Sequence, residues 1–139
     1  ASDVYKRQLT ADIAPGITLD GDSGKLMQIF YNLTDNAIKY TPENGHIAVR
    51  LAQSGANVLF AVTDDGIGIP EEDQKHIFER FYRVDKARSR ATGGTGLGLS
   101  IVRQLAAMHG GTVSVSSQPG QGATFTVTLP MDAKRGEKA

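Results

Sequence analysis

Three polar side chains between residues 24 and 40 are spaced so that they could bind an anion together with a metal ion. Asn32, Asn36 and Lys39 stand at positions i, i+4 and i+7, which places them within about 60° of one another on a helical wheel. They line the margin of an apolar arc. Asn oxygen is a hard ligand that suits Mg²⁺, and the Lys ammonium is a point charge that suits phosphate. The spacing favours a site for a polyanion with a bound cation, although a solvated helix flank would carry the same residues.

A second candidate segment, DDGIGIP at residues 64–70, directly follows an apolar stretch that is typical of a strand. Asp64 ends that stretch, so we expect it to be partly buried. A buried carboxylate is costly unless a group donates to it, and the exocyclic amine of a purine is such a donor. Gly66 and Gly68 would let a flat ring approach the backbone. An ordinary strand-to-helix turn is the alternative, because Asp and Gly are common turn residues.

A third candidate segment, GGTGLGL at residues 93–99, runs into an expected helix. Glycines here allow backbone N–H groups to point at an anion, and a helix N-terminus adds about half a positive charge. Phosphate binding is the chemistry that this pattern favours. The spacing matches neither a P-loop nor the dinucleotide-binding fingerprint. A flexible hinge without a ligand is the alternative.

The fourth candidate segment contains IFERFYR at residues 77–83 and the irregular stretch that follows it. Residues 79–90 hold five basic side chains against two acidic ones, although the chain as a whole has no net charge. Basic side chains on a mobile lid could close over a triphosphate, and a solvated face would also explain them. We expect residues 84–95 to be poorly ordered without a nucleotide.

Helices and strands that alternate along the chain must position these segments. Asp22 and Ser23 are N-cap candidates for a helix over residues 24–40, whose apolar positions share one arc. Further helices are expected over residues 71–83 and 97–109. Period-two alternation predicts strands over residues 47–51, 58–63, 113–115 and 125–129. Strand pairs joined by tight turns imply a two-layer α/β sandwich, with a mixed, mainly antiparallel sheet covered on one face by helices.

Composition limits the classes of function that are open to this chain. It has 139 residues, equal numbers of acidic and basic residues, and no cysteine. These values exclude a thiolate metal site and a catalytic thiol, and they give no support to nucleic-acid binding. The three histidines lack metal-site spacing, and the helix dipole explains His109 at a helix end. We expect a linker at residues 1–8, one domain at 9–130, a flexible tail at 131–139 and no direct membrane contact.

Taken in order, these segments resemble the motifs of the catalytic, ATP-binding domain of bacterial sensor histidine kinases. Residues 32–40 resemble the N box, 64–68 the G1 box, 78–83 the F box and 94–99 the G2 box. Residues 120–125 are similar to the final glycine motif, and the resemblance runs from Leu9 to Pro130. The same superfamily, known as GHKL, includes gyrase, heat-shock chaperone ATPases and mismatch-repair ATPases. The resemblance implies a Bergerat-type ATP-binding fold with ATP and Mg²⁺ as ligands.

The resemblance also implies a role for each matching residue. Asp64 would accept a hydrogen bond from the adenine amino group, Asn36 would coordinate Mg²⁺, and Asn32 would orient the metal shell or a phosphate. Lys39 and Arg83 would neutralise phosphate charge, so Asn32, Lys39 and Arg83 form the expected catalytic set. Tyr40 and Tyr82 would pack near the adenine or the ribose. The remaining expected nucleotide-binding residues are Gly66, Gly68, Ile69, Gly94, Thr95, Gly96, Leu97, Gly98, Leu99 and Thr124.

Two departures from the family pattern affect the expected chemistry. The ATPases of the superfamily have a glutamate at the position of Asn32, and an amide cannot act as a general base. We therefore expect slow hydrolysis. The residue after Gly122 is often Ser or Thr in relatives and supports the adenine-binding carboxylate through its hydroxyl. Here it is Ala123, and Thr124 is the expected substitute.

The function implied is transfer of the γ-phosphate from Mg·ATP to a histidine on a separate dimerisation domain, within two-component signalling. No histidine of this chain stands in the context of a phospho-acceptor, so the chain should not autophosphorylate. The implied partners are that dimerisation domain and, indirectly, a response regulator, at a cytoplasmic location in a membrane-bound sensor. A nucleotide-binding regulatory module without transfer activity and a self-contained ATPase of the superfamily are the alternatives.

Overall fold

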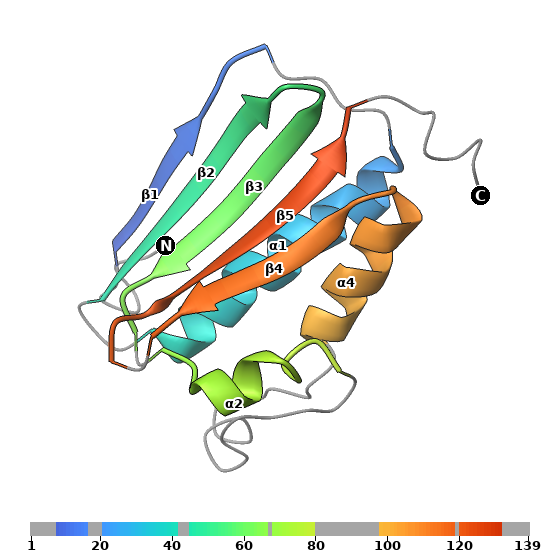
Figure 1. Ribbon diagram of the computed structural model, residues 1–139. Coiled ribbons are helices and arrows are strands. Elements are labelled where there is room, and N and C mark those ends of the chain that lie inside the picture. Colours follow the sequence, from blue (N-terminus) through green and yellow to red (C-terminus); the bar gives the residue numbers. More distant parts are fainter. Residues whose placement is uncertain are drawn as a thin grey trace.

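A computed structural model describes residues 8–16, 21–41, 45–66, 68–79, 98–118 and 120–131 of the chain, without the side chains of residues 8, 39 and 40. The helices α1 and α4 cover one face of a five-stranded sheet (Figure 1). In chain order the elements are β1 (Gln8–Ile13), α1 (Ser23–Tyr40), β2 (His46–Ser54), β3 (Asn57–Asp64), α2 (Glu71–Gln74), α4 (Gly98–Met108), β4 (Thr112–Ser117) and β5 (Ala123–Pro130).

The sheet has the strand order β1-β2-β3-β5-β4. β1 runs parallel to β2, and the other neighbouring pairs are antiparallel. This arrangement confirms the predicted two-layer α/β sandwich with a mixed, mainly antiparallel sheet. The sequence analysis did not predict β1, although its residues 9–13 (LTADI) alternate between apolar and polar types. All five residues are exposed, so this alternation marks no buried face. β1 begins at Gln8, the last residue of the expected linker.

Helix α1 forms where the periodicity predicted it. The Asp22 side chain caps the helix by accepting a hydrogen bond from the Lys25 N–H at 2.9 Å, which satisfies a backbone donor of the first turn. Ile29 and Leu33 are fully buried on the face of α1 that meets the sheet. Phe30 packs against Phe60 of β3 with ring centroids 4.4 Å apart.

His109 joins the end of α4 to the start of α1. It is 5% exposed, its Nε2 accepts a hydrogen bond from the Asp22 N–H at 3.2 Å, and its Nδ1 contacts the Leu105 carbonyl oxygen at 2.9 Å. Because a backbone N–H can only donate, Nε2 must be unprotonated, and Nδ1 then donates to Leu105. These contacts hold His109 directly after α4, and the expected effect of the helix dipole on His109 stays a prediction.

The alternation along β3 and β5 separates the two faces of the sheet. Val58, Phe60 and Val62 are buried beneath the helices, as are Phe125 and Val127. Successive strand residues point to opposite faces, so the threonines between these positions lie on the open face. This alternation decides which of the predicted site residues can meet.

Helix α2 is shorter than the sequence predicted. It ends at Gln74, and residues 75–78 form turns in which the His76 N–H donates to the Asp73 carbonyl oxygen. Ile77 is 5% exposed, and Phe78 meets Phe125 edge-on at 6.2 Å. The helix expected over residues 71–83 is therefore wrong at residues 75–79, because packing of these apolar side chains into the core replaces regular helix.

Within the described residues, none of the helices is both long enough and apolar enough to cross a lipid bilayer.

Candidate functional site

The candidate residues that are described come from elements that meet at one end of the molecule. The C-terminal end of α1, the end of β3, α2 and the start of α4 all lie at this end, the lower one in Figure 1. The end of β4 and the start of β5 lie there as well. The topology therefore brings together the described residues of the first two candidate segments with Gly98 and Leu99 of the third.

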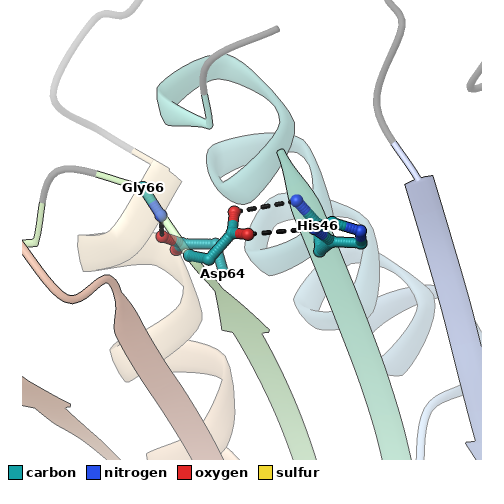
Figure 2. A network of polar contacts seen from close by, with 4 residues as sticks. His46, Asp64 and Gly66 are labelled. Carbon is teal, nitrogen blue, oxygen red and sulfur yellow. Dashed lines mark hydrogen bonds and ion pairs between the residues drawn. The ribbon is translucent and has the colours of Figure 1, made fainter. Parts of the chain in front are cut away.

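Asp64 is a buried carboxylate at the last position of β3. It is 8% exposed and lies on the face that the helices cover, in line with Phe60 and Val62. Its Oδ1 accepts a hydrogen bond from the Gly66 N–H at 2.9 Å (Figure 2). Burial raises the pKa of Asp64, and the backbone N–H groups of Gly66 and Ala123 oppose that rise. These donors offset the cost of the buried charge only in part, so a further donor on a ligand would stabilise it.

Asp65 has a different role from its neighbour. Its Oδ1 accepts from the His46 N–H at 2.8 Å, its Oδ2 lies 3.0 Å from His46 Nδ1, and its own N–H donates to the His46 carbonyl oxygen at 3.2 Å. The hydrogen bond from the His46 backbone is the main cause that lowers the pKa of Asp65. Asp65 therefore ties the end of β3 to the start of β2 and leaves Asp64 to face the interior. No sequence pattern pointed to His46.

Two side chains that sequence reasoning missed hold the backbone of the loop after Asp64. Ser117, at the end of β4, accepts from the Ile69 N–H at 2.8 Å and donates to the Gly122 carbonyl oxygen at 2.6 Å. Gln74 donates from Nε2 to the Ile69 carbonyl oxygen at 2.9 Å and to that of Ser117 at 3.0 Å. Ser117 occupies the half-buried phase of β4 after Val113 and Val115. A polar residue at a position where the alternation predicts an apolar one is the signal that could have identified Ser117.

Gly122 makes a close backbone contact with Asp64. Its φ is +81°, and a Cβ at this position would lie 2.0 Å from the Asp64 carbonyl oxygen. Ala123 pairs with Asp64 in the register of β3 and β5. Only glycine fits this position without displacing the backbone that carries Asp64.

The predicted metal and phosphate residues of α1 lie at the margin of its buried face. Asn32 and Asn36 are half-buried and one helical turn apart, next to the buried Leu33 and Ala37. Lys39 and Tyr40 belong to the last turn of α1, and their side chains lie outside the described part of the chain.

The described glycines that were predicted to bind nucleotide occupy this end of the molecule as well. Gly66 and Gly68 both follow the end of β3 at Asp64. Gly66 is buried, and Gly68 has a φ of +76°. Gly98 begins α4, and a Cβ there would meet no atom within 4 Å. Leu99 is half-buried against the core.

Thr124 does not join this site. Its Oγ1 lies 3.0 Å from the Oγ1 of Thr63, and both side chains line a shallow hollow of about 500 Å³ on the open face of the sheet. Asp64 follows Thr63 in β3 and therefore points to the opposite face. The structure thus gives no support to the hydroxyl of Thr124 as a substitute for the missing hydroxyl at Ala123.

Several predicted site residues and the predicted lid lie outside the described residues. These are Tyr82, Arg83, Gly94, Thr95, Gly96, Leu97 and the stretch 84–95.

Comparison with known proteins identifies the family. Residues 21–133 match the family model described as histidine kinase-, DNA gyrase B- and HSP90-like ATPase. The sensor-like histidine kinase SenX3 of Mycolicibacterium smegmatis is 49% identical over 130 residues, which are 94% of this chain and 34% of that protein. The chain thus spans about a third of the length of this curated relative.

Solved structures agree with this relationship. The catalytic domain of the histidine kinase ThkA, in a nucleotide-free form, matches with a TM-score of 0.82 and 28% identity over 96% of this chain and 84% of that one. Full-length ShkA in complex with AMPPNP matches with a TM-score of 0.77 and 34% identity over 96% of this chain and 28% of that one. Sequence, fold and relatives agree that the chain belongs to the histidine kinase-, DNA gyrase B- and HSP90-like ATPase family, as the catalytic ATP-binding domain of a sensor histidine kinase.

Proposed function

We propose that this chain binds Mg·ATP at the end of the sheet where Asp64 lies and presents the γ-phosphate to a histidine on a separate dimerisation domain. The observation that carries the proposal is the buried carboxylate of Asp64, which is fixed by Gly66 and lies beneath the helices. Full-length ShkA, part of which this chain resembles, was solved in complex with AMPPNP, an ATP analogue, which supports the proposal of nucleotide binding.

Asp64 suits the adenine base in chemistry and in environment. An ionised carboxylate only accepts hydrogen bonds, and the exocyclic amine of adenine donates them. Guanine has a carbonyl oxygen at the corresponding ring position and would face the carboxylate with an acceptor. The pairing therefore selects adenine over guanine.

The margin of α1 suits the metal and the phosphates. Within the described residues, no group of three or more His, Cys, Asp or Glu side chains could hold a metal ion. Magnesium is commonly held by few protein groups together with phosphate oxygens and waters, so the amide oxygen of Asn36 is a sufficient protein ligand. When bound, Mg²⁺ would neutralise phosphate charge. Asn32 would orient this group, and Lys39 and Arg83 would add positive charge.

The remaining residues of the proposed site bind the base, the ribose or the phosphates. Tyr40 and Tyr82 would pack near the adenine or the ribose. Gly94, Thr95, Gly96, Leu97, Gly98 and Leu99 would approach the phosphates.

The amide of Asn32 favours transfer of the γ-phosphate over hydrolysis of ATP. Activation of a water molecule needs a general base, which an amide does not provide. Phosphoryl transfer to an imidazole nitrogen depends mostly on positioning and charge neutralisation. The chain is therefore suited to hold ATP until an acceptor histidine arrives. That acceptor domain, a response regulator and a cytoplasmic location belong to this proposal.

Calorimetric titration with ADP and AMPPNP, with and without Mg²⁺, tests the binding step. We expect saturable binding of both nucleotides, and we expect Mg²⁺ to increase the affinity for AMPPNP. Asn36→Ala should remove the increase that Mg²⁺ causes, while Gln28→Ala, on an exposed position of the same helix, should keep it. Equal affinity of the unmodified chain with and without Mg²⁺ would exclude the metal role of Asn36.

A further inference from the structure

We infer that Ser117 and Gln74 are positioning residues that hold the backbone after Asp64 in the geometry needed for adenine recognition. This inference rests on the proposed nucleotide function. It assigns a role to side chains from β4 and α2, which lie outside the four segments that the sequence motifs define. The contacts connect three separate parts of the chain around Asp64.

Ile69 is held on both sides of its backbone by side chains. Its N–H donates to Ser117 Oγ at 2.8 Å, and its carbonyl oxygen accepts from Gln74 Nε2 at 2.9 Å. Ile69 also packs against the hydrophobic core through its side chain. The residue that ends the glycine-containing turn is therefore fixed by hydrogen bonds as well as by packing.

The hydroxyl of Ser117 passes this restraint on to β5. It uses its single proton to donate to the Gly122 carbonyl oxygen at 2.6 Å while it accepts from Ile69. Gly122 in turn lies directly against the Asp64 backbone, where no Cβ would fit. The turn that begins at Asp64 is thus closed back onto Asp64 through Ile69, Ser117 and Gly122.

Gln74 provides a second, independent restraint. Both hydrogens of its amide are used, on the carbonyl oxygens of Ile69 and Ser117. Gln74 is the last residue of α2, so these bonds also fix where α2 ends. A small shift of the turn would move Gly66 and Gly68 relative to the buried carboxylate, and misplacement of this kind reduces recognition without removal of any ligand contact.

The test compares matched variants of the chain by calorimetry with ADP and GDP. Ser117→Ala should weaken ADP binding by about three- to tenfold, as expected for the loss of a positioning hydrogen bond, and should reduce the preference for ADP over GDP. Ser117→Thr keeps the hydroxyl and should restore affinity to within about twofold. Ser116→Ala, the same change at the exposed neighbouring position, should have no effect.

Gln74→Met keeps the length of the side chain and removes both donors. Gln104→Met, on the exposed face of α4, is its control. Gln74→Met should weaken ADP binding by about three- to tenfold, and this variant decides the test if Ser117→Ala does not fold. A purely structural role would lower the unfolding temperature but leave affinity and base preference of the folded protein unchanged. If folded Ser117→Ala and Gln74→Met keep the affinity and the base preference of the wild type, this inference is overturned, while the proposed function is not. Absence of ADP binding by the unmodified chain would overturn the proposed function.

Discussion

Asp64 and Asp65 are neighbours in the chain whose carboxylates have opposite environments. Asp64 is buried with a raised pKa, while Asp65 is exposed, is bonded to His46 and has a lowered pKa. Such a difference between adjacent acids is typical of a site in which one group faces a ligand and the other holds the structure. At the scale of single residues, this contrast supports the proposed roles, in which Asp64 recognises the base and Asp65 holds the end of β3.

The raised pKa of Asp64 predicts a pH-dependent gain of stability in Asp64→Asn. The folded protein holds the Asp64 proton more tightly than the unfolded chain, whose pKa is near 3.8. The free energy of unfolding of the wild type therefore falls as the pH rises from about 3.8 through the raised folded pKa. Without nucleotide, Asp64→Asn should become increasingly more stable than the wild type over that range. Its ADP affinity should fall about tenfold or more.

Asp65→Asn is the matched control for this experiment, because its expected effect on the free energy of unfolding has the opposite sign. The lowered pKa of Asp65 stabilises the folded state above about pH 3.8, and this contribution is lost as the pH falls through the folded pKa. Asp65→Asn should therefore be less stable than the wild type near neutral pH and equal to it in acid. Urea unfolding between pH 3 and pH 8 measures both variants, and parallel pH profiles for the two would contradict the assignment.

At the scale of elements, close contacts at strand ends and helix ends fix the frame around the site. Gly122 lets β5 begin directly against Asp64, and His109 connects the ends of α1 and α4. Neither contact is a feature of one element alone. The geometry of the site thus depends on how elements join as much as on the elements themselves.

Gly122→Ala should be far more destabilising than Gly120→Ala. Both glycines have a φ of +81°, but a Cβ at Gly120 meets no atom within 4 Å, whereas a Cβ at Gly122 meets the Asp64 carbonyl oxygen at 2.0 Å. Gly120→Ala should cost about 1–2 kcal/mol from backbone strain, and Gly122→Ala at least about 2 kcal/mol more. Urea unfolding of both variants measures the difference, and equal losses would show that the contact is unimportant.

His109→Leu should lower the free energy of unfolding by about 1–3 kcal/mol, because it leaves the Asp22 N–H and the Leu105 carbonyl oxygen without the partners that the ring provides. Met108→Leu, on the exposed neighbouring position, serves as the control and should change stability by less than about 0.5 kcal/mol. Thermal and urea unfolding would check both variants. Wild-type stability of His109→Leu would refute the role of the ring as a joint.

Periodicity predicted the elements that bury one face. Helix α1 and strands β2, β3 and β5 follow their apolar patterns, whereas β1 was not predicted although residues 9–13 alternate between apolar and polar types, and all five are exposed. The sequence also predicted a strand that ends at a buried Asp64, which the structure confirms. It could not locate the bonds from Ile69 to Ser117 or from His46 to Asp65, which span 48 and 19 residues. Such pairs depend on strand order and register, which local sequence does not encode.

At the scale of the whole molecule, the proposed function gives this chain a nucleotide site and places the phosphate acceptor on a separate domain. The three histidines of the sequence all have partners in the structure: His46 with Asp65, His76 with Glu79, and His109 with Asp22 and Leu105. His109 is buried, whereas the side chains of His46 and His76 are exposed and lie beside carboxylates. In the proposed function this chain donates a phosphate to a histidine on a separate domain.

Incubation with γ-labelled ATP and Mg²⁺ should leave the chain unlabelled and should release phosphate at less than about one turnover per second, the lower end of common enzymatic rates. Asn32→Glu introduces a carboxylate that can activate water and should increase hydrolysis about tenfold or more. A filter assay for protein-bound label and a free-phosphate assay would measure both quantities. Labelling of the chain, or rapid hydrolysis by the wild type, would favour a self-contained enzyme.

The most direct test of the account is nuclear magnetic resonance of the ¹⁵N-labelled chain during titration with Mg·AMPPNP. The backbone amide signals of Asn36, Gly66 and Ile69 should shift together along one saturation curve, because a single nucleotide would contact or order all three segments. The signals of Ser114 and Thr126, on the open face of the sheet, should stay in place. Shifts confined to the open face, or separate saturation curves for Asn36 and Gly66, would contradict a common nucleotide site.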